Sequence, residues 1–463
     1  MKEKKRGSFS GSLGFVLAAA GSAVGLGNIW RFPYLAAKDG GGIFLVVYLL
    51  LAVTFGFALL TTEISIGRRT KQSPLTAYGK LKSSWGFLGK LACIVPAIIL
   101  PYYCAIGGWV LRYFAVFVTG NVEIAAEDGN FGSFIATVPT PIICMLIYLA
   151  ATFIVVYMGV ENGIERCSKI IMPLLLVLII GIGIFGLTIR HTDEAGVTRT
   201  ALEGLKIYVI PSLEGMTLRK FMAVVVDAMG QLFYSLSVAM GIMIAYGSYM
   251  KDDVDINQSI GRIEIFDSLV AFLAGMMIVP TVFAFLGTDG MSAGPSLMFV
   301  TLPKVFNAMG GIGTVIGTVF FVMVLFAALT SSVSILEALV SSLMDQTGMT
   351  RRRACMICGV YALAAGVIVC LGYNVLYVEI PLPNGTTAQI LDIMDYLSNS
   401  ILMPIVSILT CIFIGWVLGP QVVIDEVEKS GKKMSRKRLY IAMVRFVAPV
   451  LLLILLLQSL GVF

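Results

Sequence analysis

Residues 21–33 read Gly-Ser-Ala-Val-Gly-Leu-Gly-Asn-Ile-Trp-Arg-Phe-Pro, and they place small and polar residues inside a long apolar run. If this segment lies in a bilayer and unwinds there, its amides and carbonyls lose their helical partners. Each unpaired group then costs several kcal/mol unless a ligand takes it up. Gly21 and Gly25 also form a small-xxx-small pair, which alone favours a helix-packing face. Asn28 and Arg31, placed in the same cluster, favour a break in the helix.

The composition of the chain indicates a membrane protein. Of its 463 residues, 58% are hydrophobic and only 13% are charged, and the mean hydropathy is +0.92. A soluble domain has roughly 45–50% apolar and about 25% charged residues. Because this chain cannot cover its surface with polar groups, soluble enzymes, nucleic-acid-binding proteins and disordered scaffolds are poor matches.

Long apolar runs recur along the whole chain. A bilayer core of about 30 Å needs roughly 20 apolar residues per helix. Eleven runs meet this length: 12–36, 42–66, 88–118, 140–158, 168–189, 221–248, 262–287, 312–344, 354–374, 388–418 and 439–461. We therefore predict a single all-α polytopic membrane domain over residues 1–463, with eleven transmembrane helices.

The basic residues predict the orientation of these spans. The N-terminal tail, 1–11, and the loops on its side hold 22 Lys and Arg, against seven in the opposite loops. Because cytoplasmic loops carry the excess of positive charge, we expect a cytoplasmic N-terminus and an external C-terminus in the cell's inner (plasma) membrane. The net charge of +6 then marks the cytoplasmic face, with anionic lipid headgroups as its expected contact.

The sixth run contains a second polar stretch, Gln231-Leu-Phe-Tyr-Ser-Leu-Ser237. If 12–189 and 221–418 form two repeats of five spans, the first and sixth spans occupy equivalent positions, and 439–461 adds an eleventh. Corresponding interrupted helices in two halves are typical of the central site of a transporter. We predict unwound helices at both places.

The eighth span carries a polar face. Ala327, Thr330, Ser331 and Ser334 are spaced i, i+3, i+4 and i+7, so they share one side of a helix. Hydroxyl and carbonyl oxygens are the hard donors that a sodium ion prefers. The alternative is that the hydroxyls bond back to the i−4 carbonyls. This face alone does not decide between the two.

Other chemistries have little support in the sequence. Gly290-Met-Ser-Ala-Gly294 fits the G-x-S-x-G nucleophile elbow, but it follows a membrane helix, and the only histidine, His191, is in a distant loop. An intramembrane hydrolase is therefore a distant alternative. Cys355 and Cys358 lack the further ligands of a zinc site, so we expect packed, reduced cysteines. No Walker A or GxGxxG motif indicates an ATP-driven pump.

These motifs resemble the neurotransmitter:sodium symporter family, in particular its eleven-span bacterial amino-acid transporters with the LeuT fold. The resemblance is carried by residues 21–33 with Gly40-Gly-Gly42, by residues 231–237, and by Ala327-Ala-Leu-Thr-Ser-Ser332. It implies two inverted repeats of five helices, with the first and sixth helices unwound around a site in mid-membrane.

The resemblance also implies where an amino acid would bind. The amides of Leu26 and Gly27, at a helix N-terminus, and the Tyr103 hydroxyl would hold its carboxylate. Carbonyls around Ala23 and Tyr234–Ser237, including Ser235 and Ser237, would meet its ammonium group. The expected side-chain pocket consists of Ser22, Tyr103, Ile106, Tyr234, Met240, Ser331 and Ile335. Met240 is a flexible wall where an aromatic is common, which suits hydrophobic amino acids up to aromatic size.

Two sodium sites follow from the same resemblance. The first would use Ala23, Asn28, Ser235 and Asp267, and the substrate carboxylate would complete it. The second would use Gly21, Val24, Ala327, Thr330 and Ser331. We expect no organic cofactor.

Asp267 departs from the family pattern, which usually has asparagine there. Animal members bind chloride beside this sodium, near the positions of Tyr48, Gln231 and Ser235. Because a fixed carboxylate can replace that anion, the sequence predicts chloride-independent transport. No role follows from the sequence for Glu337, one turn further along the eighth span.

The resemblance further implies two gates. Arg31 and Asp395 match the outer salt bridge of the family, and Arg6 and Asp345 match the inner one, with Tyr249 beside it and Phe9 where tryptophan is usual. Gly163 and Pro173 reproduce the G-x9-P spacing of a fifth helix that unwinds to release the inner sodium. A routine proline near a helix start is the alternative.

The expected function is sodium-coupled import of a neutral, hydrophobic or aromatic L-amino acid by alternating access. The partners are thus the amino acid, sodium ions and the lipid bilayer, with no nucleic acid and no enzymatic activity. The main alternative is a LeuT-fold carrier for another amine or osmolyte, or one coupled to protons.

Overall fold

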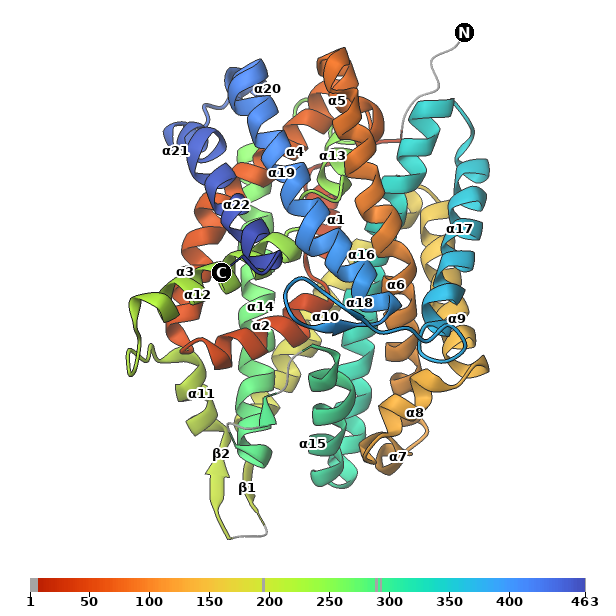
Figure 1. Cartoon of the computed structure of the whole chain (residues 1–463), viewed down its shortest axis with the longest axis vertical. Helices are drawn as coiled ribbons and strands as arrows, with labels where there is room; N and C mark the ends of the chain where they lie inside the picture. Colours follow the sequence, from red (N-terminus) through yellow and green to blue (C-terminus); the bar gives the residue numbers. More distant parts are fainter. Residues whose placement is uncertain (1–6, 194–195, 288–289, 292–293, 463) are drawn as a thin grey trace.

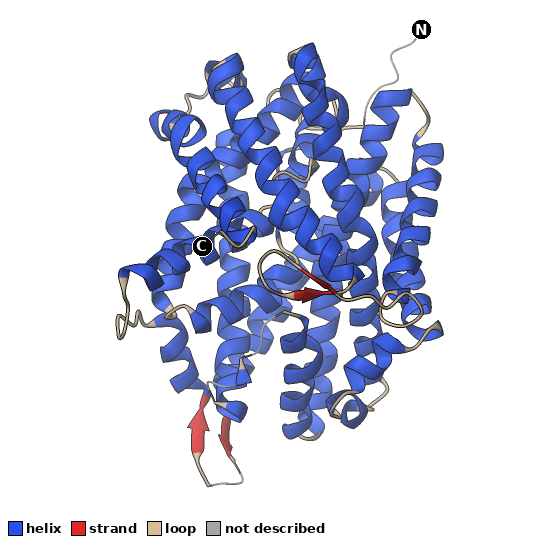
Figure 2. Cartoon of the chain, viewed as in Figure 1, coloured by secondary structure: helices blue, strands red, loops and turns tan. Residues whose placement is uncertain are grey.

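The computed structural model describes residues 7–462 apart from 194–195, 288–289 and 292–293. The chain forms a bundle of helices with two short β-hairpins, of which β1–β2 projects at the end away from the N-terminus (Figures 1 and 2). In these described residues, nine helices are long and apolar enough to cross a membrane. A bent pair, α1 (Ser12–Ala23) and α2 (Leu26–Lys38), makes a tenth span.

The exact count of eleven spans is not confirmed, because the sixth predicted run is divided. It consists of α12 (Leu218–Ser235) and α13 (Ile242–Ser248). The first of these carries Arg219, Lys220 and Asp227, and the second is only 7 residues long. Neither qualifies as an apolar span by length and composition, although together they lie where the sequence predicts a broken helix.

The remaining elements follow the predicted order. In the first half they are α3 (Gly42–Leu51), α4 (Phe57–Thr70), α5 (Pro74–Leu81), α6 (Gly86–Val118), α7 (Val122–Ala126), α8 (Asn130–Ala136), α9 (Pro139–Tyr157) and α10 (Arg166–Leu187). The connection to the second half holds β1 (Arg190–Thr192), β2 (Thr198–Thr200) and α11 (Ala201–Val209). The second half adds α14 (Ile256–Leu286), α15 (Leu302–Ala308), α16 (Gly311–Thr347), α17 (Arg351–Leu371), β3 (Ile380–Pro381), β4 (Thr387–Ala388), α18 (Ile390–Asp395) and α19 (Met403–Ile412). The C-terminal part is α20 (Gln421–Glu428), α21 (Lys437–Ala442) and α22 (Ala448–Ser459).

Six π-helical turns occur in the described residues. Three of them join two α-helices: Ala52–Gly56, Tyr396–Leu402 and Met443–Val447. The other three lie at one end of an α-helix: Val160–Glu165 begins α10, Leu297–Thr301 precedes α15 and Phe413–Leu418 follows α19. A π-helical turn inserts a residue and frees a carbonyl from the regular ladder. The carbonyl of Val53, in the first of these turns, accepts a hydrogen bond from Arg436 Nη1 at 2.7 Å.

The first break separates α1 from α2 with a bend of 55°. Val24 and Gly25 are both extended, with ψ of 99° and −166°. No side chain caps the N-terminus of α2. The first residues of this helix, Leu26, Gly27 and Asn28, are all buried, so its N-terminus lies in the protein interior.

The second break lies between Ser235 and Ile242 and uses left-handed backbone. Ser237 and Ala239 have φ of 53° and 63°, and Gly241 has φ of 70°. Left-handed conformations cost non-glycine residues roughly 1–2 kcal/mol each, so the surrounding structure must hold them in place. The buried carboxylate of Glu63, on α4, accepts a hydrogen bond from the Ala239 amide at 2.6 Å.

Glycines let α4 and α13 pack backbone against backbone. A Cβ on Gly67 would lie 2.0 Å from the Ile244 carbonyl oxygen, and a Cβ on Gly247 would lie 2.3 Å from the Ile64 carbonyl oxygen. No side-chain rotation relieves such a contact. This packing fixes α13, the segment after the second break, against α4.

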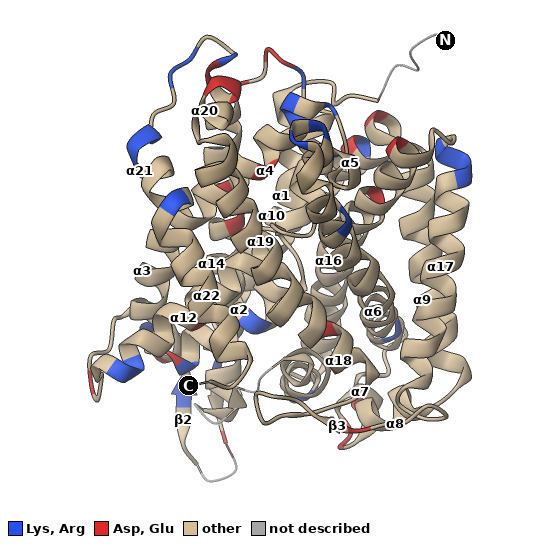
Figure 3. Cartoon of the chain, turned by 45° about the horizontal axis from the view of Figure 1, so that its top comes forward, with Lys and Arg blue, Asp and Glu red and all other residues tan. Residues whose placement is uncertain are grey.

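The predicted basic loops lie together on the face that carries the N-terminus. Figure 3 shows Lys and Arg around α5, α21 and the start of α17 on this face. Asp252 bridges two of these loops, with carboxylate oxygens 2.8 Å from both Lys71 and Lys429. The hydrogen bonds from Lys429 and Lys71 lower the pKa of Asp252 to about 2, so this bridge stays charged at any physiological pH.

We expect Gly67→Ala to destabilise the protein by about 1–3 kcal/mol, because the new methyl group overpacks a backbone contact. Thermal unfolding in detergent measures the effect as a lower midpoint. Gly181→Ala is the matched control, since Gly181 lies in α10 with nothing within 4 Å of an added Cβ. Equal midpoints for the two variants would contradict the close packing of α4 and α13.

Candidate substrate and sodium sites

A small cavity lies between the two breaks. Eleven of the twelve residues predicted to surround the substrate border it, while the twelfth, Ile106, lines a larger cavity further out. The full lining is Ser22, Ala23, Gly25, Leu26, Gly27, Asn28, Ile99, Tyr103, Tyr234, Ser235, Ser237, Met240, Ser331 and Ile335. The cavity volume is about 20 Å³, room for about one water molecule, so the lining side chains lie close to one another.

The first break supplies the polar end of this cavity. The hydroxyl of Tyr103 is buried and, within the described part of the chain, has no hydrogen-bond partner. A Cβ on Gly25 would lie 3.3 Å from this hydroxyl and 3.0 Å from Ser331 Oγ, so α6 and α16 both close on the extended backbone. An uncapped helix N-terminus and a free hydroxyl donor thus face the same space, as a carboxylate requires.

Serine side chains tie the two breaks to each other. Ser237 Oγ donates to the Ser22 carbonyl at 2.9 Å, and the two serine hydroxyls lie 3.1 Å apart. Ser331 Oγ, from α16, lies 3.2 Å from the same carbonyl. Small polar residues that look isolated in the sequence therefore form one buried network.

The four residues predicted for the first sodium site meet in space. Ser235 Oγ lies 2.6 Å from Asp267 Oδ1, 3.1 Å from Asn28 Oδ1 and 3.4 Å from the Ala23 carbonyl oxygen. Asn28 Nδ2 donates to Asp267 Oδ1 at 2.9 Å. A carboxylate, an amide oxygen, a hydroxyl and a carbonyl form a hard oxygen set that suits sodium.

Asp267 also accepts hydrogen bonds from donors around the position expected for chloride. Tyr48 OH donates to Asp267 Oδ2 at 3.0 Å, and Ser235 and Asn28 donate to Oδ1. Gln231 Nε2 is bonded to the Gly27 carbonyl at 3.2 Å. The carboxylate of Asp267 thus places a negative charge of the protein where a chloride ion is expected.

The five residues predicted for the second sodium site also come together. Ser331 Oγ lies 3.3 Å from the Val24 carbonyl oxygen, and Thr330 Oγ1 lies 3.1 Å from that of Ala327. A Cβ on Gly21 would lie 3.2 Å from Thr330 Cβ, which places α1 directly against α16. Thr330 and Ser334 do bond back along their own helix, so the alternative interpretation of this face holds for part of it.

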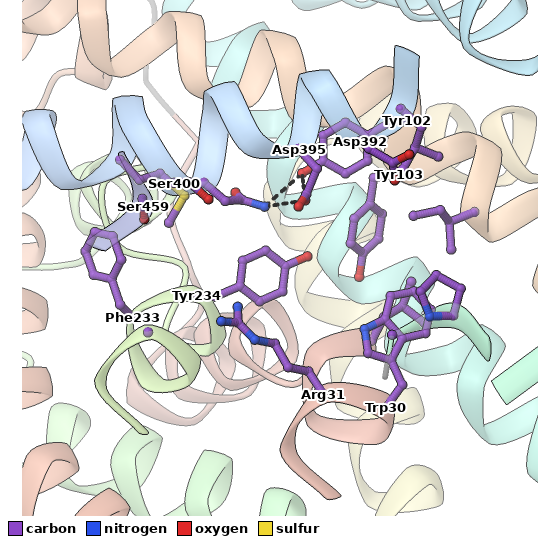
Figure 4. A pocket seen from close by; sticks show the side chains of 18 of the residues that line it. Trp30, Arg31, Tyr102, Tyr103, Phe233, Tyr234, Asp392, Asp395, Ser400 and Ser459 are labelled. Atoms are coloured by element: carbon purple, nitrogen blue, oxygen red, sulfur yellow. Dashed lines mark hydrogen bonds between the residues drawn. The ribbon is translucent and has the colours of Figure 1, made fainter. Parts of the chain in front are cut away.

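A larger cavity of about 460 Å³ adjoins the small one (Figure 4) and is lined by residues of α2 and α18, which lie further from the N-terminus than α1 does (Figure 1). Arg31 and Asp395, predicted as the outer gate, both line it. Within the described residues no ion pair within 4.0 Å joins them. Asp395 Oδ1 instead accepts from Tyr102 OH at 3.0 Å and Asn399 Nδ2 at 2.5 Å. In Figure 4, Tyr234 lies between Arg31 and Asp395.

The side toward the N-terminus is closed by aromatic packing. Phe9 contacts Phe15, Tyr246 and Tyr249 with ring centroids 5.6–6.2 Å apart, and its amide donates to the Tyr249 carbonyl. The predicted inner gate is placed only in part, because Arg6 lies outside the described residues. Asp345 Oδ2 accepts from the Ser73 amide at 2.6 Å.

Glu337, for which the sequence suggests no role, is the centre of a buried charge cluster. It is fully buried and receives two hydrogen bonds from Arg351, at 2.7 and 2.8 Å. Tyr249 OH donates at 2.5 Å to Glu337 Oε1, the oxygen that also accepts from Arg351 Nη2. The sequence contains the basic run Arg351-Arg-Arg353, but only the turn from α16 to α17 brings Arg351 to Glu337.

The predicted unwinding segment of the fifth span is already irregular. Gly163 lies in the π-helical turn Val160–Glu165, and Pro173 lies inside α10. Glu165 accepts hydrogen bonds from the amide and hydroxyl of Ser10. The N-terminal segment is therefore attached to the one turn of this span that departs from α-helical geometry. Whether this turn opens remains a prediction.

The model of the sodium:neurotransmitter symporter family matches residues 6–128 and 129–463. This chain belongs to the sodium:neurotransmitter symporter family. It is 32% identical to the uncharacterized sodium-dependent transporter YhdH of Bacillus subtilis, over all of this chain and 99% of that protein. It is 31% identical to the uncharacterized sodium-dependent transporter MJ1319 of Methanocaldococcus jannaschii, over 95% of this chain and 87% of that one.

A solved structure of the family has the same fold. MhsT in complex with L-phenylalanine superposes with a TM-score of 0.83 and 34% identity, over 98% of this chain and all of MhsT. The symporter therefore has the LeuT fold, with helices α1–α2 and α12–α13 as its two broken spans. It is a sodium-dependent, multi-pass membrane transporter.

We expect the Glu337–Arg351 pair to show strong energetic coupling. Arg351→Met should leave a buried carboxylate uncompensated and destabilise the protein by about 3–5 kcal/mol, and Glu337→Gln should also destabilise it. The double variant should lose much less than the sum of the two, which a double-mutant cycle of thermal unfolding measures.

Lys90→Met is the control for this cycle, because Lys90 is exposed and should change stability by less than about 0.5 kcal/mol. Additive losses from Arg351→Met and Glu337→Gln would show that the pair contributes no coupling.

Proposed function

We propose that this symporter imports a neutral, hydrophobic or aromatic L-amino acid with two sodium ions, by alternating access. The observation that supports this best is the polar end of the small cavity. The free Tyr103 hydroxyl and the uncapped start of α2 offer donors to a carboxylate, and the carbonyls of the breaks offer acceptors to an ammonium group. The remaining walls, Ile99, Met240 and Ile335, are apolar.

The proposed sodium sites explain how ion and substrate are coupled. Ala23 and Asn28 flank the first break, Ser235 ends α12, and Asp267 belongs to the continuous helix α14. An ion between them draws the broken helices onto α14, and the substrate carboxylate completes its shell. Each ligand then stabilises the arrangement that the other needs, so each raises the affinity for the other.

The second ion would act at the other end of the first break. Gly21 and Val24 belong to α1 and its end, whereas Ala327, Thr330 and Ser331 lie on α16. Binding there holds α1 against α16. Its release toward the cytoplasm, through the turn that contains Gly163, would free α1 to move.

The proposed orientation has a cytoplasmic N-terminus and an external C-terminus. The large cavity with Arg31 and Asp395 then opens outward, and the Phe9 cluster closes the cytoplasmic side. In this arrangement the outer gate closes over the substrate when Arg31 and Asp395 approach each other. The residual alternative is a carrier of another amine or osmolyte, or one with proton coupling; GABA and serotonin transporters are relatives at 24–26% identity.

We expect proteoliposomes that contain the protein to take up radiolabelled L-phenylalanine only with an inward sodium gradient. Asn28→Ala should lower the apparent sodium affinity by about 10–100-fold, because it removes a buried ligand and hydrogen-bond donor. Asn121→Ala, at an exposed loop position, is the matched control.

Two outcomes would contradict this assignment in different ways. Equal uptake with a proton gradient in sodium-free buffer would reject the proposed coupling. Failure of phenylalanine, tyrosine, tryptophan and leucine all to bind would reject the substrate class and leave the sodium sites standing.

We expect sodium-driven uptake to stay within about twofold when gluconate replaces chloride, because Asp267 supplies the negative charge. Asp267→Asn should lose most of its uptake in gluconate, and chloride should restore part of it. Asp425→Asn removes an exposed carboxylate at α20 and should behave as wild type. Strong chloride dependence of the wild type would overturn the proposed role of Asp267.

A further inference from the structure

Three consecutive arginines begin α17, and they differ in their surroundings. Arg351 is bound to the buried Glu337, as described above. Arg352 and Arg353 are exposed, and no acidic side chain of the described residues forms an ion pair with either. The first turn of α17 contains no acidic residue. Two guanidinium groups therefore remain uncompensated at this end of the helix.

These two arginines are the polar end of a continuous exposed stripe. Met349, Arg352, Arg353, Met356 and Ile357 line a shallow cavity of about 390 Å³. Arg352, Arg353, Met356 and Ile357 share one face of α17, and Met349 lies two residues before the helix begins. The same face continues along α17 with Val360 and Tyr361, which are 60% and 42% exposed.

The stripe is fixed to its neighbour by aromatic contacts. Arg352 lies over the ring of Tyr157 at 5.8 Å, and Tyr157 stacks on Phe153 at 5.7 Å between ring centroids. Gly359 makes the close approach possible, since its added Cβ would lie 3.0 Å from the Phe153 ring. The guanidinium of Arg352 is thus held at the N-terminal end of α17, next to the apolar surface.

We propose that this face is a binding site for one anionic phospholipid. Its phosphodiester would bind Arg352 and Arg353, since guanidinium groups recognise phosphate through paired hydrogen bonds. One acyl chain would lie along Met356, Ile357 and Val360. Charge complementarity selects an anionic headgroup, and the apolar stripe selects a molecule that has a chain attached.

A lipid bound at this site would stabilise the neighbouring cluster of Arg351, Glu337 and Tyr249. Arg351 precedes Arg352 directly, and Arg351 joins α17 to Glu337 and through it to Tyr249. A lipid that orders the first turn of α17 stabilises the native protein by mass action. The effect is independent of the amino-acid site, so it can be tested without transport.

The test compares thermal unfolding of the full-length protein in neutral detergent with added phosphatidylglycerol or phosphatidylcholine of the same chains. We expect a saturable rise of the midpoint by about 3 °C or more with phosphatidylglycerol alone. Arg352→Gln/Arg353→Gln should lose at least half of this rise, and Arg352→Lys/Arg353→Lys should retain only part of it, because lysine keeps the charge but not the paired hydrogen bonds. Lys82→Gln/Lys90→Gln removes the same charge from exposed positions elsewhere and should keep the full rise.

Three results would overturn the proposal. An unchanged rise in the Arg352→Gln/Arg353→Gln variant would place the lipid elsewhere. An equal rise with inorganic phosphate at the same concentration would indicate a simple anion site. A wild-type dimer that becomes a monomer in this variant, whatever lipid is added, would identify the face as an interface between two copies of the chain.

Discussion

The structure depends on backbone groups that two broken helices leave unpaired in the middle of a membrane domain. Lipid offers no hydrogen bonds, so each break persists only where other parts of the protein, or a ligand, take up the amides and carbonyls. Ser237 and Ser331 bond the Ser22 carbonyl, and Glu63 bonds the Ala239 amide. The groups that remain form the candidate binding cavity, so the same constraint explains both the fold and its site.

The helices that do not break supply fixed points for those that do. Asp267 on α14 reaches the first break through Asn28 and the second through Ser235. The backbone contact of Gly67 and Gly247 holds α13 on α4. Each unwound segment is therefore bordered by another helix, and Asp267 is a carboxylate that contacts residues of both broken spans. An ion that binds beside Asp267 therefore contacts both broken spans, and its binding can move one group of helices relative to another.

Much of this arrangement is visible in the sequence, because it depends on residue types that are costly in lipid. The glycine cluster at 21–27 and the polar residues at 231–237 predict the breaks, and the resemblance to the family predicts that hydroxyls on α16 lie near α1. The sequence does not predict the distances between helices. Ile99 borders the small cavity, whereas Ile106, two turns further along α6, lines the larger one. The partner of Glu337 lies beyond a turn, and the unpaired state of Arg31 and Asp395 depends on helix positions that periodicity cannot give.

The two sides of the cavity differ in a way that alternating access requires. On one side Arg31 and Asp395 line open space, and the hydrogen bonds of Tyr102 and Asn399 occupy the carboxylate. On the other side Phe9 is wedged among aromatic rings, and the Glu337–Arg351 pair, held by Tyr249, lies behind it. Because a buried ion pair is costly to separate, opening that side requires the contacts of Phe9 and Tyr249 to change while the pair stays intact. The moving surface would then pass between α13 and α16, which in the described residues are joined by hydrogen bonds from Tyr246 to Ser334 and from Tyr249 to Glu337 rather than by a salt bridge.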